Sequence, residues 1–389
     1  MKALTTLIFL LASYNCSLAQ DHPYTPKFSY EIERDLAKGV IHESRAALLS
    51  SLIGDYRAST TYSDNNVSWG VDSLSLGGLS IQDAIPFIVN AAADHQIVII
   101  SESHTKPQHR IFALELITEL SKIGFRHLGM ETLSSYPNNT LVDTLLQERE
   151  YPLNHPITGT YTLEPQMGNL VREALGLGYH LFPYERTTRG GSKGREEIQA
   201  DNISAYLNNH PDAKIVILCG LHHAIESEHR KNPESQYMAN YLKVKTGIDP
   251  LTIYQDNFTE KFTHNEHALL RRINLTGPSV FTDNKSSLVS ITPHVDVEVL
   301  HPKTVYIDGR PNWMYRKGLR KAVDIDKQGI ATYPVIVSAF PEGESNSVPV
   351  DRIELKHQND NKVLVLAPGP YRIEIYDGTN VTLVEKVVK

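Results

Sequence analysis

Short apolar runs alternate with segments of helical periodicity through the first two thirds of the chain. Four β-branched residues at 97–100 predict a strand buried on both faces. Further apolar runs predict strands at 125–131, 178–185, 214–220 and 251–254. Apolar residues three or four apart predict helices at 28–58, 80–93, 107–124, 141–148, 169–177, 196–208 and 236–246. This alternation is typical of an α/β fold with a mostly parallel sheet flanked by helices.

Three local patterns refine this prediction. Ser80-Ile-Gln-Asp83 has the spacing of a capping box and is expected to open the helix that ends near Ala93. Pro107 suits the first turn of the helix that follows the strand at 97–100. The stretch 258–305 is expected to wrap the main domain, and its alternating residues at 295–299 predict an exposed strand.

The pattern changes near residue 328 to short strands separated by turns. Strands are predicted at 333–340, 350–356, 362–366, 371–376 and 381–388. Pro368-Gly-Pro370 and Asp377-Gly-Thr-Asn380 are turn signals between them. We therefore expect an α/β domain at 20–327 and a small C-terminal antiparallel β-sandwich domain at 328–389.

Residues 1–19 have the organisation of a secretory signal peptide. Lys2 precedes the apolar stretch 4–12, and Ser17-Leu-Ala19 offers a small-residue cleavage site. Lipoprotein processing at Cys16 is the alternative, although 13–15 make a poor lipobox. Cleavage would leave Cys219 as the one cysteine, which excludes an internal disulfide. These features predict a bacterial exported protein of the periplasm, the cell surface or the medium.

Composition is that of a soluble globular protein. The 389 residues are 41% hydrophobic and 21% charged, with a net charge of -7, so no basic footprint for nucleic acid is expected. No apolar stretch after the signal is long enough to span a membrane. A phosphate loop and a dinucleotide-binding glycine pattern are both missing from the sequence.

Acidic residues and histidines follow the predicted strands, at the point where each strand ends. Glu102 and His104 follow the first strand, and in an extended segment residues two apart point to the same side. Glu131 and Glu185 end the next two strands, and His222, His223 and Glu226 follow the fourth. Because parallel strands present their carboxyl ends at one edge of a sheet, we expect these side chains to share a site.

This set of residues permits general-base chemistry or metal binding. An imidazole can deprotonate water near neutral pH, and histidines with carboxylates can hold a divalent ion. His104 is the first candidate for general base, with Glu102, Glu131 and His223 as the other catalytic candidates. Plainer roles stay open, because either glutamate can cap a following helix and Glu185 can pair with Arg186 or Arg189. Cys219 reads as a buried strand residue.

The motifs resemble a superfamily that holds the erythromycin esterases, the ChaN haem-binding lipoproteins and the TraB/Tiki proteins. The resemblance rests on Glu102-Ser-His104 with Pro107 and His109, on Glu131, and on Gly220-Leu-His-His223, and it covers about residues 95–226. The Glu-x-His spacing is nearer to the ChaN pattern, and Ser101 stands where the family usually has glycine. The spacing after Gly220 favours His223 over His222.

The resemblance implies three possible activities. Esterase-like members use the first histidine as general base on an ester or lactone, Tiki-like members are described as metal-dependent proteases, and ChaN-like members bind haem. The expected function is hydrolysis of ester or amide bonds in a small-molecule or peptide substrate, and the alternative is a haem- or metal-binding envelope protein. The candidate metal ligands are Glu102, His104, Glu131, Glu185 and His223. The candidate substrate-binding residues are His109, Arg110 and Arg186, and Arg189, Lys193 and Arg195 could also hold an anionic substrate.

Overall fold

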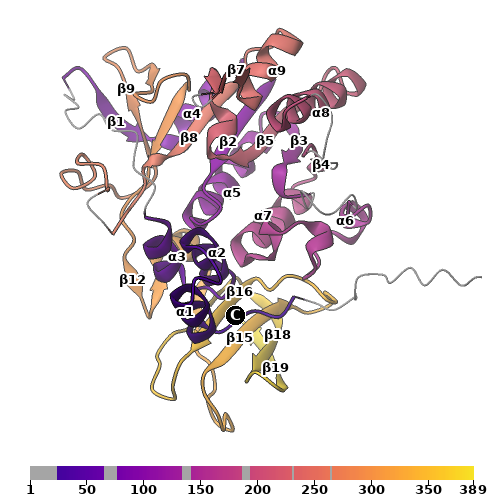
Figure 1. The fold of residues 1–389 in the computed structure, drawn as a ribbon, viewed down its shortest axis with the longest axis vertical. Helices are drawn as coiled ribbons and strands as arrows, with labels where there is room; N and C mark the ends of the chain where they lie inside the picture. The colour runs from indigo at the N-terminus through magenta and orange to yellow at the C-terminus, as the bar shows by residue number, and fades with distance from the viewer. Residues whose placement is uncertain (1–23, 65–76, 134–141, 186–192, 230–231, 263–264) are drawn as a thin grey trace, which may run out of the picture.

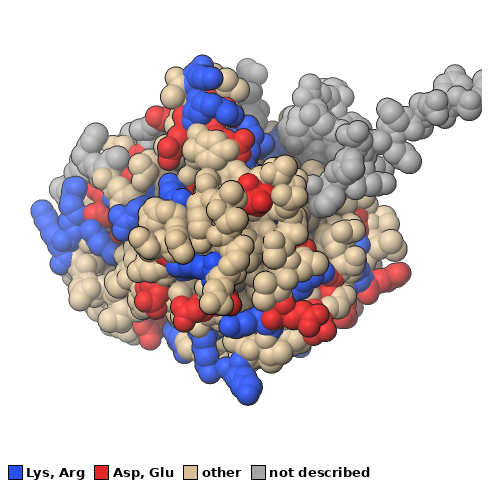
Figure 2. Space-filling model, turned by 90° about the horizontal axis from the view of Figure 1, so that it is seen from below, with Lys and Arg blue, Asp and Glu red and all other residues tan. Residues whose placement is uncertain are grey.

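The structure is a computed structural model that describes residues 24–64, 77–133, 142–185, 193–229, 232–262 and 265–389. The predicted signal peptide and Arg186 lie outside these ranges, so export, like the domain boundaries, stays a prediction. None of the described helices is both long enough and apolar enough to cross a bilayer. On the face shown in Figure 2, acidic and basic side chains are interspersed.

The centre of the fold is a sheet that has nine strands in the described ranges (Figure 1). The strand order is β1-β9-β11-β8-β2-β5-β3-β4, and β10 lies beside β9. Neighbours are parallel from β11 to β4, whereas β9 runs antiparallel to each of its neighbours β11, β1 and β10. The bounds are β1 Ser80–Asp83, β2 Ile97–Glu102, β3 Phe125–Met130, β4 His180–Pro183, β5 Lys214–Gly220, β8 Leu251–Phe258, β9 Ser279–Thr282, β10 Leu288–Val289 and β11 Val297–Leu300.

Helices cover both faces of this sheet because β2 is apolar on both sides. Val98 and Ile100 pack with one group of helices, and Ile97 and Ile99 with the other. Each such side chain, once buried, contributes about 1.5–3 kcal/mol. The first group is α4 Ala84–Ala92, α5 Pro107–Ser121 and α7 Pro165–Gly176; the second is α8 Arg195–Asn209 and α9 Met238–Thr246. The predicted α/β fold with a largely parallel sheet is confirmed.

The C-terminal part forms separate antiparallel sheets, as expected for a β-rich segment. Four strands pair in the order β16-β15-β18-β19, and β14 pairs with β17. Apolar residues from both sheets make one buried cluster that includes Val337, Ile353, Leu364 and Ile373. The bounds are β14 Lys321–Val323, β15 Val335–Pro341, β16 Asp351–Leu355, β17 Leu364–Leu366, β18 Gly369–Tyr376 and β19 Val381–Val388.

Three N-terminal helices pack beside this C-terminal sheet (Figure 1). They are α1 Ser29–Ala37, α2 Glu43–Leu52 and α3 Tyr56–Ser63, where the sequence pattern predicts a mostly helical segment. Two buried arginines join the parts: Arg352 donates to the Leu52 carbonyl at 2.7 Å, and Arg310 donates to the Gly54 carbonyl at 3.0 Å and to Asp351 at 2.5 Å. Smaller elements are α6 Leu146–Arg149, β6 Glu228–His229, β7 Asn232–Gln236, β12 Tyr306–Ile307, β13 Arg310–Pro311 and the 3-10 helices η1 Glu131–Leu133, η2 Pro156–Thr158, η3 Tyr161–Leu163, η4 Leu221–Ala224 and η5 Asn312–Gly318.

Two local predictions are wrong, both at strands on the antiparallel side of the sheet. Ser80 to Asp83 do not open a helix; they form β1, which pairs with β9, and the helix begins at Ala84. The predicted exposed strand at 295–299 is instead β11, whose four residues are all buried between β8 and β9. In each case pairing with a distant strand overrides the local pattern.

Candidate functional site

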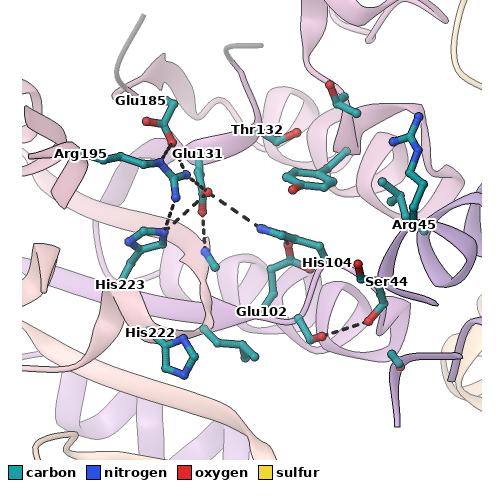
Figure 3. A pocket seen from close by; sticks show the side chains of 18 of the residues that line it. Ser44, Arg45, Glu102, His104, Glu131, Thr132, Glu185, Arg195, His222 and His223 are labelled. Carbon is teal, nitrogen blue, oxygen red and sulfur yellow. Dashed lines mark hydrogen bonds and ion pairs between the residues drawn. The ribbon is translucent and has the colours of Figure 1, made fainter. Parts of the chain in front are cut away.

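The parallel strands β2, β5, β3 and β4 end at one edge of the sheet, and a cavity of about 1080 Å³ opens there (Figure 3). Residues that follow each strand line it, together with residues from α2, α3, α8 and η3. The structure therefore brings together five of the predicted residues: Glu102, His104, Glu131, Glu185 and His223. This placement follows from the sheet order, because ligand sites in parallel sheets lie at the carboxyl ends of the strands.

Glu102 and His104 form a hydrogen-bonded pair at the end of β2. The Nδ1 atom of His104 lies 2.5 Å from Oε1 of Glu102, which orients the ring. The Nε2 atom faces Glu131, 3.9 Å from Oε1. The ring stacks on Tyr161 with centroids 3.8 Å apart, and 28% of the side chain stays exposed. A carboxylate on Nδ1 leaves Nε2 as the nitrogen that can exchange a proton with a bound molecule.

Arg110 contacts Glu102 on the side away from the cavity. Its guanidinium donates to Glu102 at 3.1 Å, to Glu164 at 2.8 Å and to the His104 carbonyl at 2.9 Å. Burial raises the pKa of Glu102, but Arg110 and His104 outweigh burial and leave it below its usual value. Glu102 therefore stays ionised and fixes the proton of His104 on Nδ1.

The polar network continues from Glu164 away from the cavity. Tyr56 donates its hydroxyl hydrogen to Glu164 at 2.9 Å, and Gln166 donates to the Tyr56 oxygen at 3.1 Å. Arg320 in turn donates to Oε1 of Gln166 at 2.8 Å. All four side chains are buried, so the network fixes Arg110 in place.

Glu131 is the first residue after β3 and carries a fixed negative charge. The backbone N–H of Gly220 donates to its Oε2 at 2.6 Å, and Arg195 pairs with its Oε1. Burial would raise the pKa of Glu131, yet His223, His104 and Arg195 together lower it to about 2. Glu131 is therefore a carboxylate at any pH near neutrality and cannot serve as a general acid.

His223 lies on the other side of Glu131 from His104. Its Nε2 is 3.7 Å from Oε1 of Glu131, and its Nδ1 is 2.7 Å from Oε2 of Glu196. Burial lowers the pKa of His223, and Arg195 adds to that effect, but Glu131 and Glu196 outweigh both and raise it above the usual value. The imidazoles of His104 and His223 thus flank the same carboxylate oxygen of Glu131. The negative charges around His223 favour its protonated form.

Arg195 is the central cation of the cavity. The sequence named it only among the basic residues that could hold an anionic substrate and did not predict its pairing with the glutamates. Its guanidinium pairs with both Glu131 and Glu185, and its Nη1 lies 3.2 Å from Nε2 of His223 (Figure 3). Glu185 thus pairs with Arg195, whereas Arg186 and Arg189, its expected partners, lie outside the described residues. A signal existed in the sequence: arginine in the first turn of a helix is disfavoured by the helix dipole, and Arg195 begins α8.

Gly220 leaves the space that His104 needs. A Cβ atom on Gly220 would lie 3.1 Å from Nε2 of His104 and 3.2 Å from Oε2 of Glu131. Its backbone angles, φ -67° and ψ 158°, are open to any residue, so the requirement for glycine is one of space.

Two of the predicted substrate-binding residues, His109 and Arg110, do not lie in the cavity. His109 is fully buried, accepts from the Ser103 N–H at 3.0 Å and contacts the Thr259 hydroxyl at 2.8 Å, and Arg110 is fully buried behind Glu102. Neither side chain reaches the cavity, because both belong to the buried face of α5. Arg186 lies outside the described residues. His222 lines the cavity beside His223, whereas Glu226 pairs with Lys243 elsewhere.

The five predicted metal ligands do not fit a metal ion in this arrangement. Among the residues that the structure describes, no group of three or more His, Cys, Asp or Glu side chains is placed to hold one. The reason is electrostatic: the Arg195 guanidinium lies between Glu131 and Glu185, and Arg110 neutralises Glu102. Arg195 thus occupies the place between two of these carboxylates where a divalent cation would bind.

Comparison with known proteins does not assign the chain to a family. No family model and no curated protein matches the chain. The type III effector HopBA1 is 11% identical, with a TM-score of 0.35 over 58% of this chain and 98% of that one. RRSP, a MARTX toxin effector domain from Vibrio vulnificus CMCP6, is 16% identical, with a TM-score of 0.29 over 49% and 44%.

ChaN of Campylobacter jejuni, described with cofacially bound haem, is also among the similar structures. It is 9% identical, with a TM-score of 0.30 over 58% of this chain and 97% of that one. Scores this low carry no argument about activity. The wider resemblance to erythromycin esterases and TraB/Tiki proteins stays a prediction from the motifs.

Proposed function

We propose that the protein hydrolyses an ester or amide bond with His104 as general base. The observation that carries the proposal is the Glu102–His104 pair. Nδ1 of His104 lies 2.5 Å from Oε1 of Glu102, and Nε2 of His104 faces a cavity of about 1080 Å³. A buried carboxylate that fixes one ring nitrogen and frees the other is the arrangement that general-base catalysis requires.

The reaction would run through a water molecule in the cavity. His104 Nε2 takes a proton from the water as its oxygen attacks the carbonyl carbon, and the carbonyl oxygen becomes negatively charged. Arg195, 34% exposed in the same cavity, supplies positive charge toward that oxygen. The tetrahedral intermediate collapses when the leaving oxygen or nitrogen accepts a proton from the His104 imidazolium or from His223. Glu102 and Glu131 stay ionised throughout.

Haem binding is the alternative from the sequence, and the cavity lining argues against it. A porphyrin needs broad apolar walls, whereas this lining includes Glu43, Arg45, Glu131, Arg195 and Glu196. His104 Nε2 is the ring nitrogen that would coordinate iron.

The test compares His104→Ala and Glu102→Gln with the wild type on a panel of ester and peptide substrates. We expect His104→Ala to lower kcat by about 10²–10⁴-fold. His95→Ala is the matched control, because His95 precedes the opposite end of β2 and bonds the Asp249 carbonyl. Hydrolysis that survives His104→Ala would overturn the general base. A Soret band that forms with hemin and is lost in His104→Ala would favour haem binding instead.

A further inference from the structure

A second cavity, of about 410 Å³, lies between α7 and the C-terminal strands and is lined by three arginines. Arg172 comes from α7, Arg316 from η5, and Arg320 from the residue before β14. Apolar residues of α7, β17 and the η5 end form other parts of the wall, namely Leu177, Leu319, Val365 and Leu366. The cavity is separate from the one at His104 and shares no lining residue with it.

Two of these arginines have carboxylate partners in the protein. Arg172 forms a bidentate ion pair with Glu344, with Nε 2.8 Å from Oε1. Arg316 pairs with Glu173 at 3.3 Å. Glu344 and Glu173 are therefore each already engaged in an ion pair with another arginine.

Arg320 is the excess cation. It is 8% exposed, and its side chain bonds the neutral Gln166 amide at 2.8 Å. Within the described ranges no carboxylate pairs with it, since nearby Asp351 is held by Arg310 at 2.5 Å. Burial, and next the charge of Arg316, lower the pKa of Arg320 to about 10. The charges of Asp351 and Glu173 offset this effect only in part. A buried cation whose charge is not fully balanced is unfavourable, so the fold keeps Arg320 at a cost.

Arg316 shows two further signs of a ligand site. Its Nε atom is buried and has no hydrogen-bond partner among the described residues. Its backbone is left-handed, with φ 44° and ψ 54°, and so is that of Lys317, with φ 54° and ψ 32°. Non-glycine residues seldom adopt this conformation, and such strain gathers at functional sites.

We propose that this cavity binds a small organic molecule through a phosphate or carboxylate group, which contacts Arg320 and Arg316. Arginine presents paired N–H donors that match the oxygens of either group. The volume exceeds what one inorganic ion fills, so the rest of the ligand packs on the apolar wall formed by Leu177, Leu319, Val365 and Leu366. The site is independent of the hydrolysis proposed above.

The experiment measures the unfolding temperature and calorimetric binding of the full chain at constant ionic strength. The probes are inorganic phosphate, phenyl phosphate and benzoate, with chloride as the reference anion. Phosphate or benzoate should raise the unfolding temperature of the wild type, and the organic ion of the preferred group should bind at least tenfold more tightly than inorganic phosphate. Which of the two organic ions binds identifies the acidic group.

Arg320→Gln and Arg316→Gln should each weaken this binding at least tenfold. Arg126→Gln, at an exposed arginine on β3, is the control and should bind as the wild type does. Without ligand, Arg320→Gln should unfold at the wild-type temperature or above, since it removes a buried charge that the protein balances only in part. Loss of folding in Arg320→Gln, or shifts equal to those with chloride, would overturn the proposal. So would binding unchanged in both variants.

Discussion

Replacement of Glu131 by Gln tests the electrostatics of the cavity without a known substrate. Gln keeps the size of the side chain and can still accept from the Gly220 N–H, so the change removes chiefly the charge. The pKa of Glu131 falls from 4.5 to about 2 in the folded protein, which corresponds to about 3 kcal/mol in favour of the ionised form. We expect Glu131→Gln to lower the free energy of unfolding by about that amount at pH 7.

The lowered pKa of Glu131 also determines how this stabilisation varies with pH. Because the folded pKa lies below the unfolded one, the stabilisation is present above pH 4.5 and is lost as the pH falls toward 2. The difference between wild type and Glu131→Gln should therefore shrink to about half by pH 3. Urea unfolding followed by circular dichroism measures it at each pH.

Glu119→Gln is the control for this experiment. Glu119 is 39% exposed and pairs with Lys122 on the surface of α5, so its loss should change stability by under about 0.5 kcal/mol. A Glu131→Gln protein as stable as the wild type at pH 7, or a difference that does not vary with pH, would refute the reasoning.

Three further substitutions test other parts of the structure. Gly220→Ala should fold normally but lower kcat/KM about tenfold, because the added Cβ displaces His104. Gly176→Ala is its control: a Cβ there meets nothing within 4 Å, so folding and kcat/KM should both stay unchanged. Arg110→Gln should cost about 3–5 kcal/mol in urea unfolding, because it leaves buried carboxylates unpaired; a cost below 1 kcal/mol would contradict that. Burial raises the pKa of Glu298 to about 7, so its contribution to stability is lost as pH rises from 4.5 through 7; Glu298→Gln should match the wild type at pH 4 and exceed it by about 3 kcal/mol at pH 8. Equal stability of the two proteins at pH 8 would refute the last expectation.

The gathering of Glu102, His104, Glu131 and His223 could be predicted because it depends on local rules alone. A buried strand at 97–100, period-two side chains and parallel order place strand-end residues at one edge. No partner had to be known. The same reasoning leads from apolar runs to the α/β fold.

What could not be predicted depends on residues distant in sequence. Arg195 reaches Glu131 across 64 positions, and Arg110 reaches Glu164 across 54. These pairs decide that the carboxylates are neutralised by arginines rather than by a metal ion, and no periodicity records them. The prediction that His109 binds substrate was wrong for a related reason, because the His109 ring is buried against Thr259, which is 150 residues away in the sequence.

The buried arginines Arg310 and Arg352 bear on how this protein can be divided. Arg352 holds the end of α2, and Arg310 joins Gly54 to Asp351. A Cβ on Gly54 would meet the Arg352 carbonyl oxygen at 1.9 Å, so the two chain segments are fitted to each other at backbone distance. The C-terminal sheet is therefore not an interchangeable module. A chimera with a foreign C-terminal segment would have to recreate these contacts before the N-terminal helices could wall the cavity.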